Sequence, residues 1–311
     1  MMRLLADIGG TNARFALAEP DGMPVEERHF LVRDFAEPSD AIDAYLGERK
    51  VAEAVIAVAT PIEHDQVRFT NSHWAFSIEG LRRRHGLERL EVINDFVAQA
   101  LAMPHLAAHE VEQIGGDAGA LGRPVAVLGP GTGLGVSALI PSRGGWTALP
   151  TQGGHLAFAP ADAREQSVLE YLRQRFGHVS NETALSGQGL LNLAQALAAI
   201  DDRTCAAESP EDVSEAARDD RCPSCREAVM LFSGALGAAA GDLALVYGAH
   251  GGVFVAGGIC LRLGPLFDRA AFRRRFEAKG RMRYYVEAIP IWLVLRRDTG
   301  LLGAAHYRAA E

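Results

Sequence analysis

The chain has 311 residues, enough for two domains, since single hydrophobic cores usually stop growing at roughly 250–300 residues. Hydrophobic residues make up 48% of the sequence and charged residues 23%, a balance typical of an ordinary globular protein and not of a disordered or fibrous one. The formal net charge of -8 argues against nucleic-acid binding, which depends on Lys and Arg that neutralise phosphates, so a small-molecule substrate is the better expectation.

Two features of the chain bear on its location. The N-terminus reaches Asp7 and a glycine turn before an apolar stretch of signal-peptide length can form, so export is not expected. Asp242 and His250 interrupt the stretch of small residues at 233–260, so no membrane span is expected either. These observations predict a cytoplasmic protein.

Strand-like and helix-like segments alternate along the chain, which predicts an α/β architecture. The predicted strands are 4–8, 14–17, 54–58, 92–93, 125–128, 136–139, 253–256 and 289–295. The predicted helices are 39–49, 78–85, 96–102, 163–176, 187–200 and 228–246. We expect Ser77 to cap the second of these helices, with Glu79 in its first turn.

The first two predicted strands are joined by a glycine turn that suits phosphate binding. Gly9 and Gly10 have no side chains, so backbone N–H groups can converge on an anion without obstruction. The turn leads to a strand and has no Lys, which distinguishes it from a Walker A loop and from a Rossmann loop. Asp7 ends an otherwise apolar strand, which is costly unless a ligand such as metal-bound water compensates for it. An ordinary hairpin turn is the alternative.

A second candidate site follows the strand predicted at 92–93. Asp95 lies at the end of this strand, the favoured position for ligand chemistry in α/β sheets, and as a base it would accept a proton from a substrate hydroxyl. Asn94 can both donate to and accept from another hydroxyl. Asp95 also occupies the N-cap position of the helix that follows, so a purely structural role stays open.

The segment 129–135 has four glycines in seven positions. Because each glycine in regular structure costs about 0.5–1 kcal/mol relative to alanine, close approach of a ligand accounts for these glycines better than folding alone. The segment repeats the plan of the first turn, a Gly-Thr turn between two strands, so the chain is expected to start a similar fold twice, with chance similarity as the alternative. Two such turns facing each other would enclose the phosphates of a nucleotide.

Three further segments have both a functional and a structural interpretation. Gln152 and His155 flank two glycines and either present an amide and an imidazole to a polyol or form an exposed turn. Glu182 either supplies a carboxylate or merely opens a helix. Gly257 and Gly258 end a buried strand, which suits a flat ring lying on the backbone and equally suits a plain strand-to-helix turn.

The chain has four cysteines, too few and too unevenly spaced for a disulfide framework. They are Cys205, Cys222, Cys225 and Cys260. The C-x-x-C pair would need two further ligands from elsewhere in the chain to form a zinc site, and reduced thiols are the simpler expectation.

Taken together, these segments resemble the bacterial glucokinase family of the actin-like hexokinase superfamily. The resemblance covers essentially the whole chain and rests on the order and spacing of seven motifs. They are Asp-Ile-Gly-Gly-Thr-Asn-Ala-Arg at 7–14, Thr-Asn-Ser-His-Trp-Ala-Phe-Ser at 70–77, Ile-Asn-Asp-Phe at 93–96, Gly-Thr-Gly-Leu-Gly-Val at 131–136, Gly-Gly-His at 153–155, Leu-Ser-Gly at 185–187 and Ala-Gly-Gly-Ile at 256–259. The C-x-x-C pair does not reproduce the cysteine-rich zinc motif of related repressors and kinases, which favours the branch without zinc.

The resemblance implies a two-lobe, actin-like (ribonuclease H-like) α/β fold with a cleft between a small and a large domain. The small domain would comprise residues 1–106 and a C-terminal helix at about 298–311, and the large domain residues 107–297. The implied activity is ATP-dependent phosphorylation of glucose at its 6-hydroxyl, the first step of glycolysis, with Mg²⁺ and in a homodimer.

The resemblance also implies roles for individual residues, with Asp95 as the catalytic base. The implied sugar-binding residues are Asn71, Asn94, Asp95, Gln152, His155 and Glu182. The implied ATP-binding residues are Asp7 (through Mg²⁺-bound water), Ile8, Gly9, Gly10, Thr11, Asn12, Gly131, Thr132 and Gly133, with Gly257 and Gly258 near the adenosine.

One departure from the family pattern is Gln152, where the family normally has Glu before Gly-Gly-His. Hydrogen bonds to charged groups contribute about 1.5–3 kcal/mol, against about 0.5–1.5 kcal/mol for neutral ones. Weaker glucose binding, or use of another hexose such as mannose, fructose or an N-acetylhexosamine, is therefore an alternative. A non-catalytic sugar sensor is a further alternative, although such regulators usually carry an N-terminal helix-turn-helix, for which the first strand at about Leu4 leaves no room.

Overall fold

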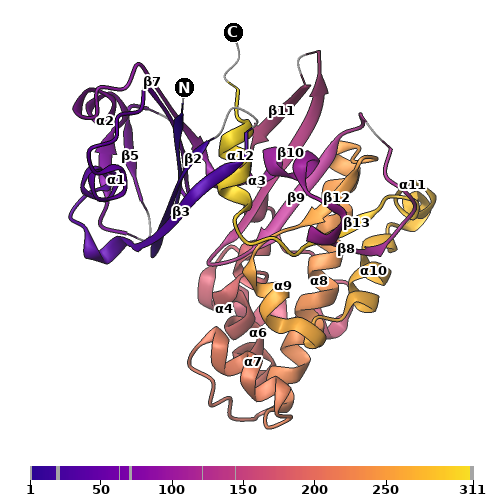
Figure 1. Cartoon of the computed structure of the whole chain (residues 1–311). Coiled ribbons are helices and arrows are strands. Elements are labelled where there is room, and N and C mark those ends of the chain that lie inside the picture. The colour runs from indigo at the N-terminus through magenta and orange to yellow at the C-terminus, as the bar shows by residue number, and fades with distance from the viewer. Residues whose placement is uncertain are drawn as a thin grey trace. The chain divides into compact units, whose positions relative to one another are not determined.

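The computed structural model describes residues 2–18, 22–62, 64–69, 72–120, 122–143 and 145–308 (Figure 1). The chain forms two compact units, each with its own sheet and hydrophobic core. The first unit comprises Met1–Ala107, Ala148–Pro150 and Asp298–Glu311, and the second comprises Ala108–Thr147 and Thr151–Arg297. The C-terminal segment therefore belongs with the N-terminal third of the chain.

The sheet of the first unit has five strands in the order β3-β2-β1-β4-β7. Its central strand β1 pairs antiparallel with β2 and parallel with β4, which in turn pairs parallel with β7. The strands are β1 (Arg3–Ile8), β2 (Asn12–Ala18), β3 (Pro24–Leu31), β4 (Glu53–Val58) and β7 (Arg89–Asn94), and a separate hairpin contains β5 (Gln66–Arg68) and β6 (Ala75–Ser77). Because β1, β4 and β7 are parallel, their carboxyl ends lie at one edge of the sheet.

The helices of the first unit are α1 (Pro38–Leu46), α2 (Ile78–Arg84), α3 (Asp95–Ala102) and α12 (Thr299–His306). As predicted, Ser77 caps α2, since its side chain accepts a hydrogen bond from the N–H of Gly80 at 2.9 Å. Figure 1 shows α12, in yellow, beside α3. The two helices approach so closely that a Cβ at Gly303 of α12 would lie 1.6 Å from the carbonyl oxygen of Ala98.

The sheet of the second unit has six strands in the order β11-β10-β9-β12-β13-β8. Its central strand β9 pairs antiparallel with β10 and parallel with β12, and β12 pairs parallel with β13. The strands are β8 (Val111–Gly115), β9 (Val125–Pro130), β10 (Leu134–Ser142), β11 (Gly145–Pro150), β12 (Gly252–Val255) and β13 (Ile291–Val294). The two sheets share one strand plan, which confirms that the chain starts a similar fold twice.

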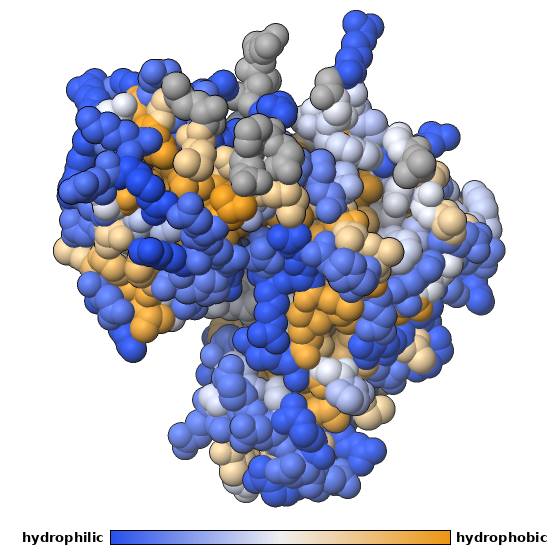
Figure 2. All heavy atoms as spheres, in the orientation of Figure 1, coloured by the Kyte–Doolittle hydropathy of each residue, from blue (hydrophilic) through white to orange (hydrophobic). Residues whose placement is uncertain are grey.

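The second unit contains most of the helices. They are α4 (Ala163–Phe176), α5 (Asn181–Ala184), α6 (Gly187–Ile200), α7 (Pro210–Arg218), α8 (Pro223–Tyr247), α9 (Gly258–Leu263), α10 (Arg269–Glu277) and α11 (Arg283–Val286). Short 3-10 helices lie at Val32–Asp34 and Met103–His105 in the first unit, and at Ala108–Glu110, Gly153–His155, Gly264–Leu266 and Gly280–Met282 in the second. On the face drawn in Figure 2, the part of the unit around α7 is mostly hydrophilic.

By length and apolar composition alone the helix α8 could cross a membrane, a feature that the sequence interpretation did not anticipate. Within the fold, however, 67% of its apolar stretch is buried, as in the core helix of a globular domain. Small residues let α10 pack directly on it: a Cβ at Gly237 would lie 2.1 Å from the carbonyl oxygen of Phe272, and one at Gly241 would lie 2.5 Å from that of Phe276. The glycines of α8 therefore serve helix packing.

Candidate active site

Two carboxyl groups of the first unit meet at the edge where its parallel strands end. Ile8 of β1 and Asn94 of β7 are both in register with Val58 of the strand between them. This register brings Asp7 and Asp95 close enough for their negative charges to interact. The sheet thus collects two acidic side chains that lie almost 90 residues apart in the sequence.

Burial raises the pKa of the half-buried Asp95 carboxyl, and the charge of Asp7 raises it further, to about 7. Hydrogen bonds from the backbone N–H groups of Phe96 and Asp95 and from the Asn94 side chain act in the opposite direction. A carboxyl group with a pKa near 7 is about half ionised at neutral pH and holds a proton well once it has accepted one. These are the properties of a general base.

At the start of α3, the N-cap position and the carboxyl group with the raised pKa belong to two different residues. The N-cap is Asn94, not Asp95 as its position in the sequence suggested, and Asp95 is the first residue of the helix. The N–H of Phe96 donates to Oδ1 of Asn94 at 3.0 Å and to Oδ1 of Asp95 at 2.9 Å. The interpretation that Asp95 is simply the N-cap is therefore wrong, and the capping oxygen belongs to Asn94.

Asp7 is held by two residues that the sequence interpretation missed. Arg14, its register partner on β2, places a guanidinium nitrogen 3.1 Å from Oδ2, and Gly300 at the start of α12 also lies directly against the carboxyl group. Burial raises the pKa of Asp7, and the charge and hydrogen bond of Arg14 lower it. A glycine in the first turn of a helix, where alanine is intrinsically favoured, was the signal that could have identified position 300.

The β1–β2 turn is closed by a hydrogen bond of 2.9 Å from the N–H of Gly9 to the carbonyl oxygen of Asn12, and the Thr11 carbonyl accepts from the N–H of Val32. Neither Gly9 nor its counterpart Gly131 in the second unit has a positive φ. An added Cβ would make only an ordinary contact at Gly9 and would meet nothing within 4 Å at Gly131. Because the fold does not require glycine at these two positions, close approach of a ligand remains the better explanation.

In the second unit, Glu182 and His155 lie beside the β9–β10 turn. Glu182, in the first turn of α5, accepts a hydrogen bond from the N–H of Leu134 at 2.7 Å. Its other carboxylate oxygen lies 3.9 Å from Nε2 of His155. A Cβ at Gly133 would lie 2.3 Å from Oε2 of Glu182, so this glycine is required by the carboxylate next to it. Thr132, between Gly131 and Gly133, is exposed.

Gln152 lies just before the 3-10 turn that carries His155, and its carbonyl oxygen accepts a hydrogen bond from the N–H of His155 at 3.0 Å. Within this unit the chain therefore brings together Gln152, His155 and Glu182, which are separate in the sequence. Asn71, the remaining candidate for sugar binding, lies outside the described residues.

Gly257 and Gly258 form the turn between β12 and α9. Gly257 has a φ of 86° and would place a Cβ 2.5 Å from the carbonyl oxygen of Pro130, so the fold itself requires glycine there. A cavity of about 210 Å³ opens next to this turn, beside Ile259 and beside Gly187, whose N–H donates to the carbonyl oxygen of Gly131. The cavity is lined by Gly187, Leu190, Pro210, Glu211, Ser214, Glu215, Arg218, Ile259 and Arg262. Its α7 wall was missed, because no helix was predicted there.

Comparison with known proteins gives consistent matches over the full length. The family model described as glucokinase matches residues 4–311. The chain is 48% identical to a glucokinase of Paramagnetospirillum magneticum, in an alignment that covers 98% of this chain and 96% of the relative. It is 47% identical to a glucokinase of Chromobacterium violaceum, in an alignment that covers 99% of this chain and 89% of the relative. It is similar to a solved glucokinase from an Antarctic psychrotroph, with a TM-score of 0.89 and 36% identity over 98% of each chain. A glucokinase from Balamuthia mandrillaris solved with glucose shares the fold, with a TM-score of 0.83 at 22% identity over 98% of this chain and 92% of that one.

Proposed function

Because the chain belongs to the glucokinase family and has its two-lobe actin-like fold, it catalyses ATP-dependent phosphorylation of glucose, and we propose that Asp95 is the catalytic base. The observation that carries this proposal is the Asp95 carboxyl group at the carboxyl edge of the sheet, with its pKa raised to about 7. Family membership also favours an enzyme over the non-catalytic sugar sensor.

In the proposed step, the 6-hydroxyl oxygen of glucose attacks the γ-phosphorus of ATP while Asp95 accepts the hydroxyl proton. The bond from the γ-phosphorus to the bridging oxygen breaks, and ADP leaves with that oxygen. Asp95→Asn tests the assignment, because asparagine keeps the shape of the side chain and cannot take up the proton. We expect kcat to fall by about 10²–10⁴-fold with glucose binding retained. An unchanged kcat would show that the base is another group.

We propose that Asp7 contacts Mg²⁺ through a bound water. The metal would neutralise charge on the phosphates, and oxygen donors such as a carboxylate and water are the ligands it prefers. Asp7 fits this role because it is held at a strand end with only 17% of its side chain exposed and with Arg14 on one oxygen. The chain's own part is to fix the carboxylate where it can orient that water.

The two glycine turns are proposed to bind the phosphates of ATP. The residues are Ile8, Gly9, Gly10, Thr11 and Asn12 in the first unit and Gly131, Thr132 and Gly133 in the second. Support comes from Gly9 and Gly131, which the fold does not need as glycines. We place the adenosine at Gly257 and Gly258 with the adjoining cavity, since Gly187 links that cavity to the second turn.

We propose that Asn94, Gln152, His155 and Glu182 bind the sugar hydroxyls, together with Asn71 on the strength of its motif alone. Glucose is the expected substrate, and Gln152 keeps mannose, fructose or an N-acetylhexosamine open as additional ones. An assay of ADP release across these sugars tests the preference. The highest kcat/KM is expected for glucose, and a higher value for another sugar would reassign the substrate.

The remaining assignments rest on the family resemblance. We propose that the units found here correspond to a small domain of residues 1–106 and 298–311 and a large domain of residues 107–297. We further propose that the enzyme acts as a homodimer in the cytoplasm and supplies glucose 6-phosphate to glycolysis. Light scattering should then give twice the chain mass of 33.3 kDa, and the mass of a single chain would argue against the dimer.

A further inference from the structure

Three of the four cysteines come together in the second unit, outside the candidate active site. Cys205 lies in the loop between α6 and α7, whereas Cys222 and Cys225 lie at the start of α8. Their Sγ atoms all lie within 4.8 Å of one another. The fold thus adds a third thiol to the C-x-x-C pair, which by itself carries too few ligands for a metal.

The sulfur positions are close to those of a metal-thiolate site. Zinc–sulfur bonds of about 2.3 Å in tetrahedral geometry place neighbouring sulfurs roughly 3.8 Å apart. The Sγ atoms of Cys205 and Cys225 are 3.9 Å apart, which matches this spacing and is far from the roughly 2.05 Å of a disulfide. The other two sulfur–sulfur distances are at most 4.8 Å.

Cys222 is placed as a thiolate ligand would be. It is the N-cap of the 25-residue helix α8, and its Sγ accepts a hydrogen bond from the N–H of Cys225 at 3.2 Å. The Cys222 sulfur is therefore an acceptor that the helix backbone holds in position beside the other two thiols. This feature is independent of the clustering of the three thiols and points to the same chemistry.

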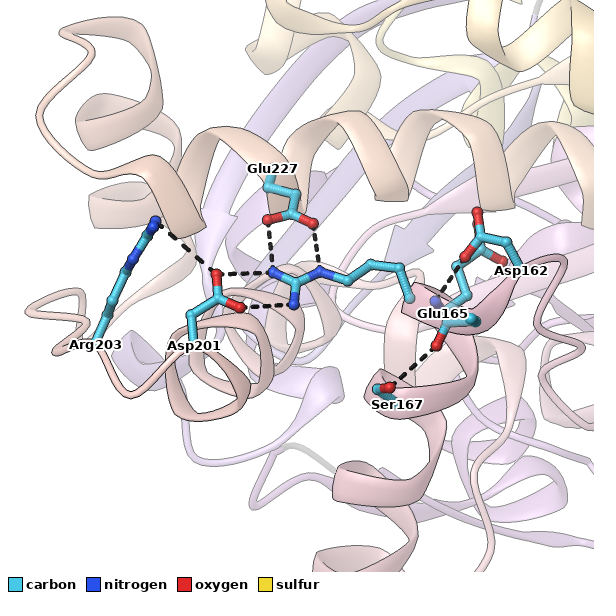
Figure 3. A network of polar contacts seen from close by, with 8 residues as sticks. Asp162, Glu165, Ser167, Asp201, Arg203 and Glu227 are labelled. Atoms are coloured by element: carbon cyan, nitrogen blue, oxygen red, sulfur yellow. Dashed lines mark hydrogen bonds and ion pairs between the residues drawn. The ribbon is translucent and has the colours of Figure 1, made fainter.

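The segments that carry the thiols are fixed to each other by one arginine. Figure 3 shows Asp201, at the end of α6, and Glu227, on α8, on either side of a single guanidinium group. That group belongs to Arg164, which donates to both carboxylates at 2.7–2.9 Å. Asp201 lies four residues before Cys205, and Glu227 lies two residues after Cys225. The three thiols are therefore held together before any ligand binds.

Without a cation the cluster disfavours thiolates. Burial raises the pKa of Cys225, and the neighbouring Cys222 and Cys205 raise it further. A divalent cation reverses this relation, because it turns the mutual repulsion of three thiolates into coordination. Cys205 and Cys222 are only half-buried, so water can reach a metal from that side.

We propose that Cys205, Cys222 and Cys225 bind one thiophilic divalent cation, of which Zn²⁺ is the common example, with water in the fourth position. Binding replaces the three thiol protons, which pass to the solvent. The three cysteines do not form the cysteine-rich zinc motif of the related repressors and kinases, which the chain lacks. It would clamp both ends of α7, which begins five residues after Cys205 and ends four residues before Cys222.

The test is a titration of reduced, chelator-treated full-length protein with Co²⁺, followed by displacement with Zn²⁺. We expect thiolate-to-cobalt charge-transfer absorption that saturates at one equivalent and disappears when Zn²⁺ is added. At metal concentrations roughly 100-fold above Kd, the melting temperature should rise by about 5 °C. Absence of the charge-transfer absorption in the wild-type protein would overturn the proposal.

Cys222→Ser is the decisive variant, because serine is a preferred N-cap and keeps an acceptor for the N–H of Cys225 while it removes the thiolate. We expect it to fold, to lose the charge-transfer absorption and to bind metal at least tenfold more weakly. Cys205→Ser removes a different thiol, one that lies in a loop and not in a helix, and it should also abolish the charge-transfer absorption and weaken metal binding. Cys260→Ala removes the one cysteine outside the cluster and should leave one equivalent bound. Unaltered cobalt spectra in both serine variants would refute the site.

Discussion

The carboxyl group of Asp7, on the first strand, lies directly against the backbone of Gly300, in the first turn of the last helix. A methyl group at position 300 would lie 2.6 Å from both Cγ and Oδ2 of Asp7. The approach places the carboxylate at the N-terminal end of α12, where the helix dipole favours negative charge. Burial raises the pKa of Asp7, whereas the charge and the hydrogen bond of Arg14 lower it.

We therefore expect Gly300→Ala to damage ATP use more than sugar binding. The added methyl group must displace either α12 or the carboxylate, and overpacking of this kind costs about 1–3 kcal/mol of unfolding free energy. The measurements are KM for ATP, KM for glucose and a denaturant midpoint. Gly234→Ala is the matched control, because that helical glycine would gain only an ordinary contact at 3.4 Å. If the two variants had the same KM values and the same denaturant midpoint, the close contact between Gly300 and Asp7 would not matter for ATP use.

The pH dependence of the reaction should report the carboxyl group of Asp95. A base works only when deprotonated, and its pKa in the free enzyme is about 7. The value of kcat/KM should therefore rise about tenfold per pH unit below pH 7 and level off above it. Removing the charge of Asp7 removes one cause of the raised pKa, so in Asp7→Asn the inflection should move to lower pH. An inflection near pH 4 in the wild-type enzyme would contradict the assignment.

The raised pKa of Asp95 also predicts that the folded protein becomes more stable when this carboxyl group is replaced by a neutral one. Its folded-state pKa lies above the ordinary 3.8, so the folded state holds a proton that the unfolded chain releases between about pH 4 and 7. The carboxyl group therefore costs stability as the pH rises through this window, and the full cost is present above pH 7. Asp95→Asn should be more stable than the wild-type protein at pH 8, by on the order of 1–3 kcal/mol, and the gain should vanish near pH 4. Urea unfolding at the two pH values measures the difference, and an equal effect at both would rule out this origin.

Much of this arrangement was predictable from the sequence, and the exceptions have physical causes. The strand β9 stands out as a continuous apolar run, and the helix α6 stands out because its apolar residues recur at helical spacing. The strand β3, at one edge of its sheet, carries Glu26, Glu27 and Arg28 and resembles a loop in composition. The helix α7 has only Val213 and Ala217 buried, so its apolar pattern is too weak to detect.

The site shows the same division. Asp7, Asn94 and Asp95 were recognisable because polar residues at the end of a buried strand are unusual. Gly300 was missed because its role depends on a contact between the two ends of the chain, and locally the sequence shows only a glycine where a helix favours alanine. The N-cap was assigned one residue late because Asn94 and Asp95 are equally suitable by residue type, and only the backbone geometry distinguishes them.

Gln152 gives a prediction about substrate affinity. If it binds a sugar hydroxyl, Gln152→Glu adds a charged acceptor and should strengthen that hydrogen bond by about 1 kcal/mol. KM for glucose should fall about fivefold with little change in kcat, and Gln152→Ala should raise it. The same measurements with mannose and fructose show whether the gain is specific to glucose. A KM that is insensitive to both substitutions would remove Gln152 from the sugar site.

Glu182 and Gly133 give the most discriminating prediction, because each constrains the other. Oε2 of Glu182 accepts a hydrogen bond from the N–H of Leu134 at 2.7 Å, and a methyl group at position 133 would lie 2.3 Å from this oxygen. Gly133→Ala should therefore push the carboxylate away and produce the same defect as Glu182→Ala, a raised KM for glucose. The two substitutions should not add in the double variant, since the second removes an interaction that the first has already broken. Additive effects on the free energy derived from kcat/KM would mean that the glycine is needed for a phosphate and not for the carboxylate.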